Sequence, residues 1–578
     1  MIKRVLLFCD TLISKLVLSL RRFPEAICFY SVAVSILIYM NHITYNHETM
    51  NMLKRIAMIF ALGAVMFLCI RVLLERKPFL GKRAKLLMYS GAIISLMLYY
   101  YFLLIDMNMV SVSRYIALSL SLYLIFTFIP HFYKKENYEL YLITLFTRFF
   151  VTYLYSIVLF VGLAAIIFTI EQLFGIKITQ GRLYLDIWLV VAGIFAPAFF
   201  LADIPQQEDK LYVEDYSKVL KVLLLYIVLP IIVAYTAVLY AFFIKILLTK
   251  EWPKGIVSNL VLWYSIISTI VIFCIYPLRN KDRIVYYFIR IFPKFIIIPL
   301  VMMFIAMGIR INAYGITENR YFVLVAGLWV AGCMIYYVSS KNIRNIILTV
   351  SLAIVMAMSV IGPWSSYSIS KYSQNSRFEK ILKQNDMITD AGIIKPSQEL
   401  SSDEKEELTS ILYYFERNHK LSDLKFLPEN FKMEYMAKVF GFEPFHGIGI
   451  KYFSLHAMEG DELIDISDYD YYLDILPYIK MEGQSFEGNL NVSYSEREHQ
   501  LKISSKGELI YEKNVEDIAR TVYEENEGKE VLKKREMLFT DENENIKVLY
   551  VFNHINGRED DDRTIIEYIE FKLFIKKI

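Results

Sequence analysis

The sequence predicts a polytopic α-helical membrane bundle of about eleven spans, followed by a C-terminal extracytoplasmic α+β domain that contains an antiparallel sheet. Hydrophobic residues make up 56% of the 578 residues, more than the roughly 45–50% of ordinary globular domains. They form runs of about 18 to 25 residues before residue 363 and are dispersed after it. The net charge changes sign at the same place. A membrane domain followed by a soluble domain accounts for all three observations.

The charge difference between the two parts is large. From Trp364 onward, 28 Lys and Arg residues stand against 42 Asp and Glu, whereas the part before it holds 34 against 17. A basic membrane domain suits anionic inner-leaflet lipid, and an acidic soluble domain argues against nucleic acid as a partner. We therefore expect membrane lipid as a partner, with an anionic lipid or another envelope component as a candidate ligand. The sequence assigns no cofactor and no protein partner.

The apolar runs set the expected spans. They lie near 24–41, 56–74, 86–105, 114–130, 143–170, 184–202, 219–247, 259–277, 286–309, 321–339 and 345–362. Prolines and charges interrupt the ninth, which predicts an interfacial first half and a kinked spanning half. Apolar residues share one helical face in residues 1–22, which predicts an amphipathic interfacial helix; a signal peptide is the alternative. The expected domains are therefore 1–22, 23–363 (membrane) and 364–578 (soluble).

The basic residues between the spans predict the orientation. With the N-terminus inside, the cytoplasmic segments hold about nineteen Lys and Arg and the outer loops about eight. Because eleven is odd, the C-terminal domain then faces the extracytoplasmic side of the cell membrane. A miscount by one span would reverse this conclusion.

The soluble part is expected to begin with helices and to continue with strands. Helices are expected over 370–384 and 401–420, where Ser401 and Glu404 have the spacing of a capping box, and near 430–440. Five later segments alternate apolar and polar residues and predict antiparallel strands, with a helix near 515–538 between them. In the last strand, one face is expected to carry Ile565, Ile569, Phe571, Leu573 and Ile575.

No catalytic or metal-binding set can be assigned from the sequence. His446 and His456 come nearest to a ligand cluster, but their spacing matches no known ligand turn, and the five cysteines form no CxxC pair. Four ionisable residues fall within the apolar runs, where snorkelling at span ends competes with a functional role; they are Arg148, Asp186, Arg290 and Lys294. The sequence favours a protein without enzymatic activity.

The loop GIRINAYGITENRYF, between the ninth and tenth spans, is the densest polar cluster among the short loops. Arg310 and Arg320 could hold an anionic group such as a lipid phosphate. The alternative is a capped turn, in which Thr317 caps the next helix and Glu318 favours its first turn. Both interpretations remain open at this point.

This loop, together with the segment IGPWSSYSISKYSQNSRFEKIL, resembles the bacterial membrane family known as domain of unknown function 4153. The order of spans, loop, Gly-Pro-Trp-Ser exit and mixed outer domain also fits. The family has no assigned reaction, so the resemblance implies an architecture and no catalytic residues. It implies recurrent positions at Tyr314, Gly315, Thr317, Arg320, Tyr321, Trp329, Gly362, Pro363, Trp364, Ser365, Gln374 and Arg377.

The exit segment is expected to leave the membrane at its outer face. Gly362 and Pro363 end the last span, Trp364 lies at the interface, and the serines carry the chain into water. The exit and the loop then share one surface. The candidate binding residues on it are Arg310, Tyr314, Thr317, Glu318, Arg320, Tyr321, Trp364 and Arg377.

Three functions remain compatible with the sequence. The favoured one is an envelope protein that binds or senses an envelope component. A transporter or lipid flippase is the second, although no internal repeat is visible. The third is a glycosyltransferase that uses a polyprenyl-phosphate sugar; it would need an acid in the first outer loop, where Glu48 is the one candidate.

Overall fold

The computed structural model describes most of the chain in two compact units. The described residues are 14–43, 47–77, 81–131, 137–175, 181–205, 212–250, 256–389, 392–428, 430–445, 450–458, 464–475, 484–486, 490–495, 498–526, 529–560 and 563–578. One unit comprises residues 1–380 with 415–425, and the other comprises residues 381–414 with 426–578.

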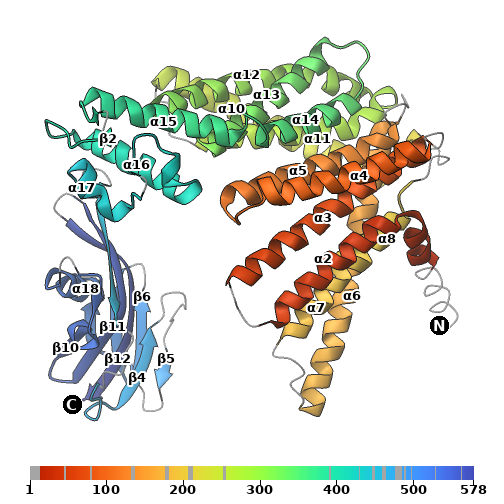
Figure 1. Cartoon of the computed structure of the whole chain (residues 1–578). Helices are drawn as coiled ribbons and strands as arrows, with labels where there is room; N and C mark the ends of the chain where they lie inside the picture. Colours follow the sequence, from red (N-terminus) through yellow and green to blue (C-terminus); the bar gives the residue numbers. More distant parts are fainter. Residues whose placement is uncertain are drawn as a thin grey trace. The chain divides into compact units, whose positions relative to one another are not determined.

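The first unit is a helical bundle (Figure 1). Its helices are α2 (Pro24–His42), α3 (His47–Arg76), α4 (Lys82–Leu98), α5 (Met109–Phe128), α6 (Tyr138–Phe174), α7 (Arg182–Val190), α8 (Ala196–Ala202), α9 (Lys218–Val222), α10 (Leu229–Thr249), α11 (Ile256–Ile275), α12 (Arg283–Tyr314), α13 (Glu318–Ser339), α14 (Ile346–Val360) and most of α15 (Ser366–Gln384). Within the described ranges, ten helical segments are long and apolar enough to cross a membrane. The predicted multi-pass bundle is thereby confirmed. The eleventh predicted span, α14, is a shorter apolar helix of 15 residues.

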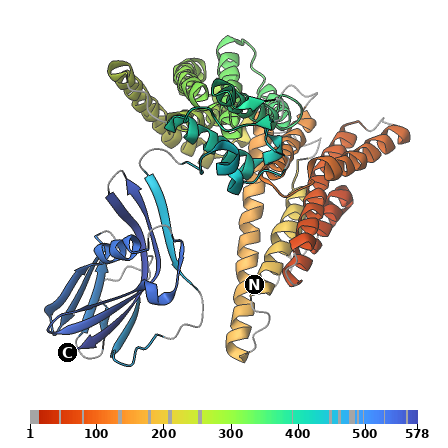
Figure 2. The same ribbon diagram turned by 60° about the vertical axis from the view of Figure 1, so that its left-hand side comes forward.

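Several apolar cores hold these helices together. One core joins α10, α11, α12 and α13 around fully buried residues such as Val261, Ile296 and Val330. Another joins α2, α3, α6 and α8 around Phe23 and Tyr141. Many other apolar side chains stay exposed along α6 and α10, as expected for helices that face lipid. Figure 2 shows α6 as one long continuous helix.

The ninth predicted span differs from the expectation, because α12 runs unbroken through Pro293 and Pro299. A proline has no N–H, so the carbonyl four residues earlier loses its helical donor. For Pro299 that carbonyl belongs to Phe295, and the Tyr240 hydroxyl of α10 donates to it at 3.0 Å. A neighbouring helix thus satisfies the backbone and lets the helix continue.

The amphipathic N-terminal segment is described only from residue 14. Residues 14–22 are helical, and Val17, Leu18 and Leu20 are 41–50% exposed. Lys15 pairs with Asp203 at 2.7 Å. A helix that has exposed apolar side chains and is held in place by this ion pair suits the membrane surface. Residues 1–13 lie outside the described part, so the interfacial helix over 1–22 stays a prediction.

The second unit begins with short helices. Helix α16 (Ser402–Asn418) starts with the predicted capping box, since Ser401 Oγ accepts from the Glu404 N–H at 3.4 Å and Glu404 Oε2 accepts from the Ser401 N–H at 3.0 Å. Helix α17 (Met436–Phe440) ends at Gly441, which has a positive φ of 86°. The last turn of α16, from Phe415, belongs to the helical bundle.

Two antiparallel-rich sheets with α18 (Val515–Glu524) form the rest of this unit (Figures 1 and 2). The larger sheet has the order β4-β12-β11-β3-β9, with β10 also paired to β11, and the smaller has the order β5-β6-β7-β8. The strands are β3 (Ile450–Ala457), β4 (Tyr471–Ile475), β5 (Gln484–Phe486), β6 (Leu490–Ser495), β7 (Gln500–Ser505), β8 (Glu508–Asn514), β9 (Val531–Leu532), β10 (Leu538–Glu542), β11 (Ile546–Asp560) and β12 (Arg563–Lys577). A small pair, β1 (Ile388–Thr389) with β2 (Gly392–Ile393), precedes them. Both sheets and α18 contribute to one core.

Two details of this unit correct the sequence prediction. The helix expected near 515–538 ends at Glu524, and the later residues form β9 and β10. The register of β11 and β12 shifts between Asn556 and Gly557, so Ile566, not Ile565, enters the core. A β-bulge reverses the inward and outward positions on its far side, which a strict alternation of residues does not reveal.

Candidate functional site

The chain turns at Gly315, within residues 313–317, which comprise the last two residues of α12 and the connection to α13. This residue has φ +67° and ψ −177°, a conformation that only glycine adopts readily. A Cβ atom there would lie 2.7 Å from the Arg377 Cδ and 2.9 Å from the Gln374 Nε2. We call residues 313–317 the Tyr-Gly loop. Its backbone needs glycine for both conformation and space.

Side chains of α15 hold the Tyr-Gly loop. The Ser373 Oγ accepts from the Ile316 N–H at 2.9 Å, and the Gln374 Nε2 donates to the carbonyls of Tyr314 and Ile316 at 3.2 and 3.1 Å. The Arg377 Nη2 donates to the Ala313 carbonyl at 3.0 Å. The last carbonyls of a helix have no helical donor. These contacts therefore supply donors to the C-terminal end of α12.

Arg320 has the same role from α13. Its Nη1 donates to the carbonyls of Tyr314 and Gly315 at 3.0 and 2.8 Å, and its guanidinium lies 5.5 Å from the centroid of the Tyr314 ring. Arg310 and Arg377 lie close enough to repel its charge. The structure thus brings these predicted residues together around the turn, with Arg320 and Arg377 bonded to its backbone.

The exit segment joins the same region through two predicted residues. The Tyr321 hydroxyl donates to the Trp364 carbonyl at 2.7 Å, and the Trp364 side chain is 51% exposed, in keeping with an interfacial position. Gly362 has φ +88° and separates α14 from α15. The serines that follow do not all face water: Ser365, Ser366 and Ser370 are buried.

Thr317 and Glu318 begin α13 in an unexpected way. Thr317 occupies the N-cap position, but its side chain makes no capping hydrogen bond. Glu318 is only 3% exposed. Its Oε1 lies 2.7 Å from the Nε2 of His419, whose side chain is 1% exposed. The sequence placed Glu318 among exposed candidates, whereas it forms a buried pair with a residue about a hundred positions away.

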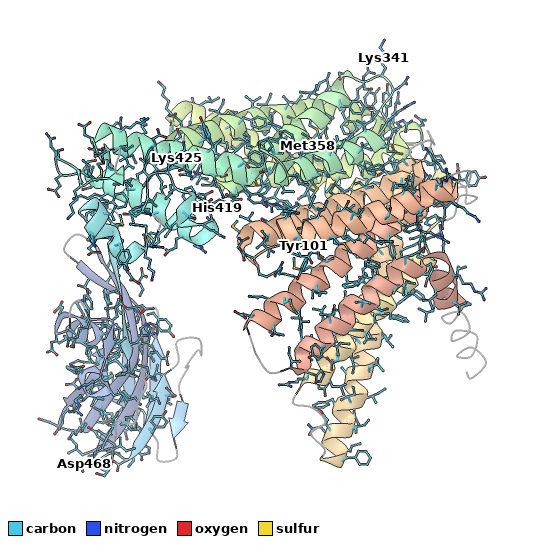
Figure 3. The ribbon with its side chains drawn as sticks, viewed as in Figure 1. Tyr101, Lys341, Met358, His419, Lys425 and Asp468 are labelled. Atoms are coloured by element: carbon cyan, nitrogen blue, oxygen red, sulfur yellow. The ribbon has the colours of Figure 1, made fainter. Side chains whose placement is uncertain are left out.

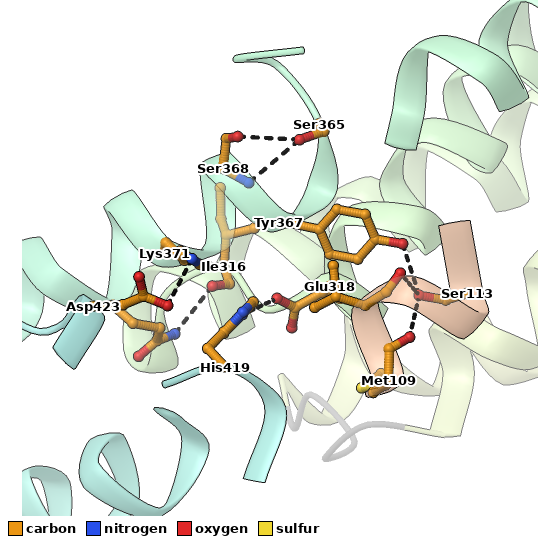
Figure 4. A network of polar contacts seen from close by, with 12 residues as sticks. Met109, Ser113, Ile316, Glu318, Ser365, Tyr367, Ser368, Lys371, His419 and Asp423 are labelled. Carbon is orange, nitrogen blue, oxygen red and sulfur yellow. Dashed lines mark hydrogen bonds and ion pairs between the residues drawn. The ribbon is translucent and has the colours of Figure 1, made fainter. Parts of the chain in front are cut away.

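A polar cavity opens beside this pair, and we call it the exit cavity. Its volume is about 440 Å³. Polar lining residues come from α5 and the residue before it, from α15 with the preceding Ser365, and from segment 419–423 within the bundle; they are Asn108, Arg114, Ser365, Tyr367, Ser368, Lys371, His419, Lys420 and Asp423. Figure 4 shows several of these side chains converging from separate elements.

Segment 419–425 is fixed against α15. The Lys371 Nζ lies 2.7 Å from the Asp423 carboxylate. The Asn375 Nδ2 donates to the Asp423 carbonyl at 3.0 Å, and its Oδ1 accepts from the Lys425 N–H at 2.9 Å. In Figure 3, His419 lies at the end of the α13–α14 hairpin opposite to Lys341. The cavity wall is therefore an ordered part of the bundle.

The α5 side of the cavity is also ordered. The Tyr367 and Ser113 hydroxyls lie 2.7 Å apart. The Arg114 Nε donates to the Val360 carbonyl at 3.2 Å and its Nη1 to the Leu103 carbonyl at 3.3 Å, while the guanidinium lies 5.0 Å from the Tyr367 ring centroid. Burial raises the pKa of Tyr367, so its hydroxyl stays protonated at neutral pH and can donate.

Reasoning from the sequence missed the cavity residues of α5 and of segment 419–423. No local motif marks them, because α5, α15 and segment 419–423 meet only through tertiary packing. Two weak signals existed. Asn108 caps α5 through its Oδ1, 2.9 Å from the Ser111 N–H, and the pattern Arg-Asn-His-Lys spans the C-terminal end of the amphipathic helix α16, with its last two residues beyond the helix.

The other sequence candidates lie elsewhere. His446 lies outside the described residues, and His456 lies beside His554 on paired strands, with ring centroids 4.0 Å apart. In the part of the chain that the structure describes, no group of three or more His, Cys, Asp or Glu residues could hold a metal ion. The lack of a metal or cofactor stays a prediction.

A family model matches residues 26–392, from α2 to β2. The chain belongs to the family Domain of unknown function (DUF4153). The DUF4153 match contains the Tyr-Gly loop and the cavity residues of α5 and α15, but not His419, Lys420 or Asp423. The chain is similar to "Uncharacterized protein PM1469" of Pasteurella multocida (strain Pm70), with 24% identity over 330 residues. The alignment covers 54% of each protein, so the chain spans about half the length of this relative. No solved structure matches the chain.

Proposed function

We propose that this multi-pass membrane protein binds an anionic group of an envelope component, such as a lipid phosphate, in the exit cavity. One observation carries the proposal. Three cations, Arg114, Lys371 and Lys420, line the cavity, and Asp423 is the one carboxylate among the lining residues that the structure describes. Volumes of about 300 to 1,000 Å³ are typical of small-molecule sites, and the excess of positive charge selects an anion.

The helix that begins at the cavity adds to this preference. The first turn of α15 contributes Tyr367 and Ser368 to the lining. The N-terminal end of a helix carries a partial positive charge and suits a phosphate. The hydroxyls of Ser368 and Tyr367 can hydrogen-bond the oxygens of a bound phosphate. The predicted site residues Arg310, Arg320 and Trp364 are not among the residues that line this cavity.

The proposed location is the cell membrane, with the N-terminus in the cytoplasm and the C-terminal domain outside. The basic connecting segments support this orientation. It requires α14 to cross as the eleventh span, although its 15 residues reach only about 22 Å of a core of about 30 Å. Local thinning and the exposed Trp364 at its exit would allow this. Reporter fusions after residues 80 and 570 test it; activity on the same side would refute it.

A headgroup without lipid chains gives the sharpest binding test. We expect glycerol phosphate to bind the purified full-length protein in detergent, as measured by isothermal titration calorimetry. Replacing Lys371 and Lys420 together by Gln removes two cavity charges and should weaken binding about tenfold or more, at roughly 1 kcal/mol per charge. Lys380→Gln is the matched control, because Lys380 is exposed elsewhere on α15. Equal loss in the control, or none in the double variant, would refute the proposal.

The purified full-length protein also allows the two alternative functions to be tested. A transporter or flippase would move a labelled lipid between leaflets of a vesicle, and a glycosyltransferase would lose lipid-linked sugar transfer in Glu48→Gln. Glu48 lies in the first turn of α3. We expect neither activity, and either one would replace the binding function proposed for the exit cavity.

A further inference from the structure

An apolar groove of about 650 Å³ lies between helices α10 and α12, and none of its lining residues belongs to the exit cavity. Aromatic side chains form much of its walls. The groove is lined by Ala237 and Tyr240 of α10 and by Tyr287, Phe288, Ile291 and Phe295 of α12, among others. Both helices belong to candidate membrane spans. The groove is therefore expected to lie within the apolar part of the bilayer.

The dimensions of the groove suit one lipid chain. Its α12 wall extends from Ile284 to Phe295, which is about 16 Å of helix and matches one leaflet of a core of about 30 Å. Dividing the volume by this length gives a cross-section of about 40 Å². A helix with side chains is about 10 Å wide and needs roughly twice that area. An extended acyl chain fits where a helix does not.

A stripe of cations borders the groove. Arg283, Arg290 and Lys294 are all exposed on α12 and stand at positions i, i+7 and i+11, so they share one helical face. Tyr287 lies on the same stripe and also lines the groove. The Arg290 Nη1 lies 3.1 Å from the Tyr286 hydroxyl. Neither α10 nor α12 contains an acidic residue.

We propose that this groove binds an anionic phospholipid, with one acyl chain between α10 and α12 and the phosphate on the cationic stripe. Long Arg and Lys side chains reach from an apolar helix toward headgroups. The aromatic walls hold the chain, and the stripe distinguishes an anionic headgroup from a zwitterionic one. This site is separate from the exit cavity, and it takes a lipid through its chain as well as its headgroup.

Filling the groove tests the chain position. Full-length protein is purified with a mixture of phosphatidylglycerol and phosphatidylcholine, and retained lipid is counted by native mass spectrometry. Ala237→Phe should lower the retained phosphatidylglycerol several-fold. Ala234→Phe should not, because Ala234 is exposed on α10 outside the stripe formed by Val233, Ala237 and Tyr240. Equal retention in both variants would overturn the proposal.

Neutralising the stripe tests the headgroup. Replacing Arg283, Arg290 and Lys294 by Gln should reduce the preference for phosphatidylglycerol by about fivefold for each charge, while Lys245→Gln on α10 leaves it unchanged. No preference in the wild-type protein would overturn the proposal, as would a co-purified protein in place of lipid. Loss of glycerol phosphate binding in the Lys371 and Lys420 double variant reports on the exit cavity, and loss of phosphatidylglycerol retention in Ala237→Phe reports on the groove, so the two proposals fail separately.

Discussion

The Tyr-Gly loop and the exit cavity use the same kinds of side chain for opposite purposes. In the loop, Arg320 and Arg377 bind main-chain carbonyls and close the end of α12. In the cavity, Lys371 and Lys420 border an open volume of about 440 Å³. Arg320 and Arg377 therefore keep the scaffold in place, whereas Lys371 and Lys420 form ion pairs with Asp423 and Asp106 and border the open volume, where a ligand can reach them. Position alone does not distinguish the two.

The largest effect is expected at the buried pair that joins the two regions. Glu318→Ala or His419→Ala removes one partner of a contact whose side chains are 4% and 1% exposed. Leaving a buried ionisable group without this partner costs about 3 kcal/mol, so thermal unfolding should shift downward in both variants.

The double variant should be more stable than the sum of the two single losses, because residues in direct contact couple. Additive losses would show that Glu318 and His419 act independently, and the cavity wall would then be held by other contacts. Unfolding followed by circular dichroism in detergent measures all three variants.

Gly315→Ala should have the next largest effect. A side chain at φ +67° and in contact with Gln374 and Arg377 costs about 2 kcal/mol. Gly332→Ala is the control, because Gly332 lies inside α13 with open space around it and alanine favours a helix. If both variants unfold at the same temperature, the close approach at Gly315 does not exist in solution.

Lys371→Gln should weaken ligand binding with little effect on stability, which sharpens the comparison between loop and cavity. Its ion pair with Asp423 is about one-third exposed, and such a pair contributes about 1 kcal/mol or less. The melting temperature should therefore change little, while binding of glycerol phosphate weakens. Arg377→Gln should show the reverse, with a lower melting temperature. The same pattern in both variants would remove the distinction between loop and cavity.

The smallest effect concerns pH in the second unit. Burial, and then the positive charge of the neighbouring His456, lowers the pKa of His554; Ser454, Asn556 and Tyr568 surround its ring, and Glu570 acts in the opposite direction. The unfolded chain therefore binds the proton first. The stability contribution is complete above about pH 6.5 and is lost as the pH falls through the folded-state pKa. His554→Gln should reduce this loss; an unchanged pH profile would contradict it.

Periodicity and hydropathy predicted much of the fold, because both depend on neighbours in the sequence. The spans, the capping box at Ser401 and most strands were found this way. The register shift at Gly557 could not be predicted in this way, because a bulge depends on how two strands fit together. The Tyr-Gly loop was visible as a dense motif, but the roles of its residues were not. His419 and Asp423 reach the cavity only through the packing of distant segments, which no local pattern encodes.

The most direct test of the cavity proposal fills the space without changing a charge. Val110 lines the exit cavity, and its neighbour Met109 is 49% exposed. Glycerol phosphate should bind the wild-type protein and Met109→Trp equally in isothermal titration, and Val110→Trp should abolish binding while the protein remains folded. If Val110→Trp binds as well as the wild type, the anion site lies elsewhere and the exit cavity has no part in it.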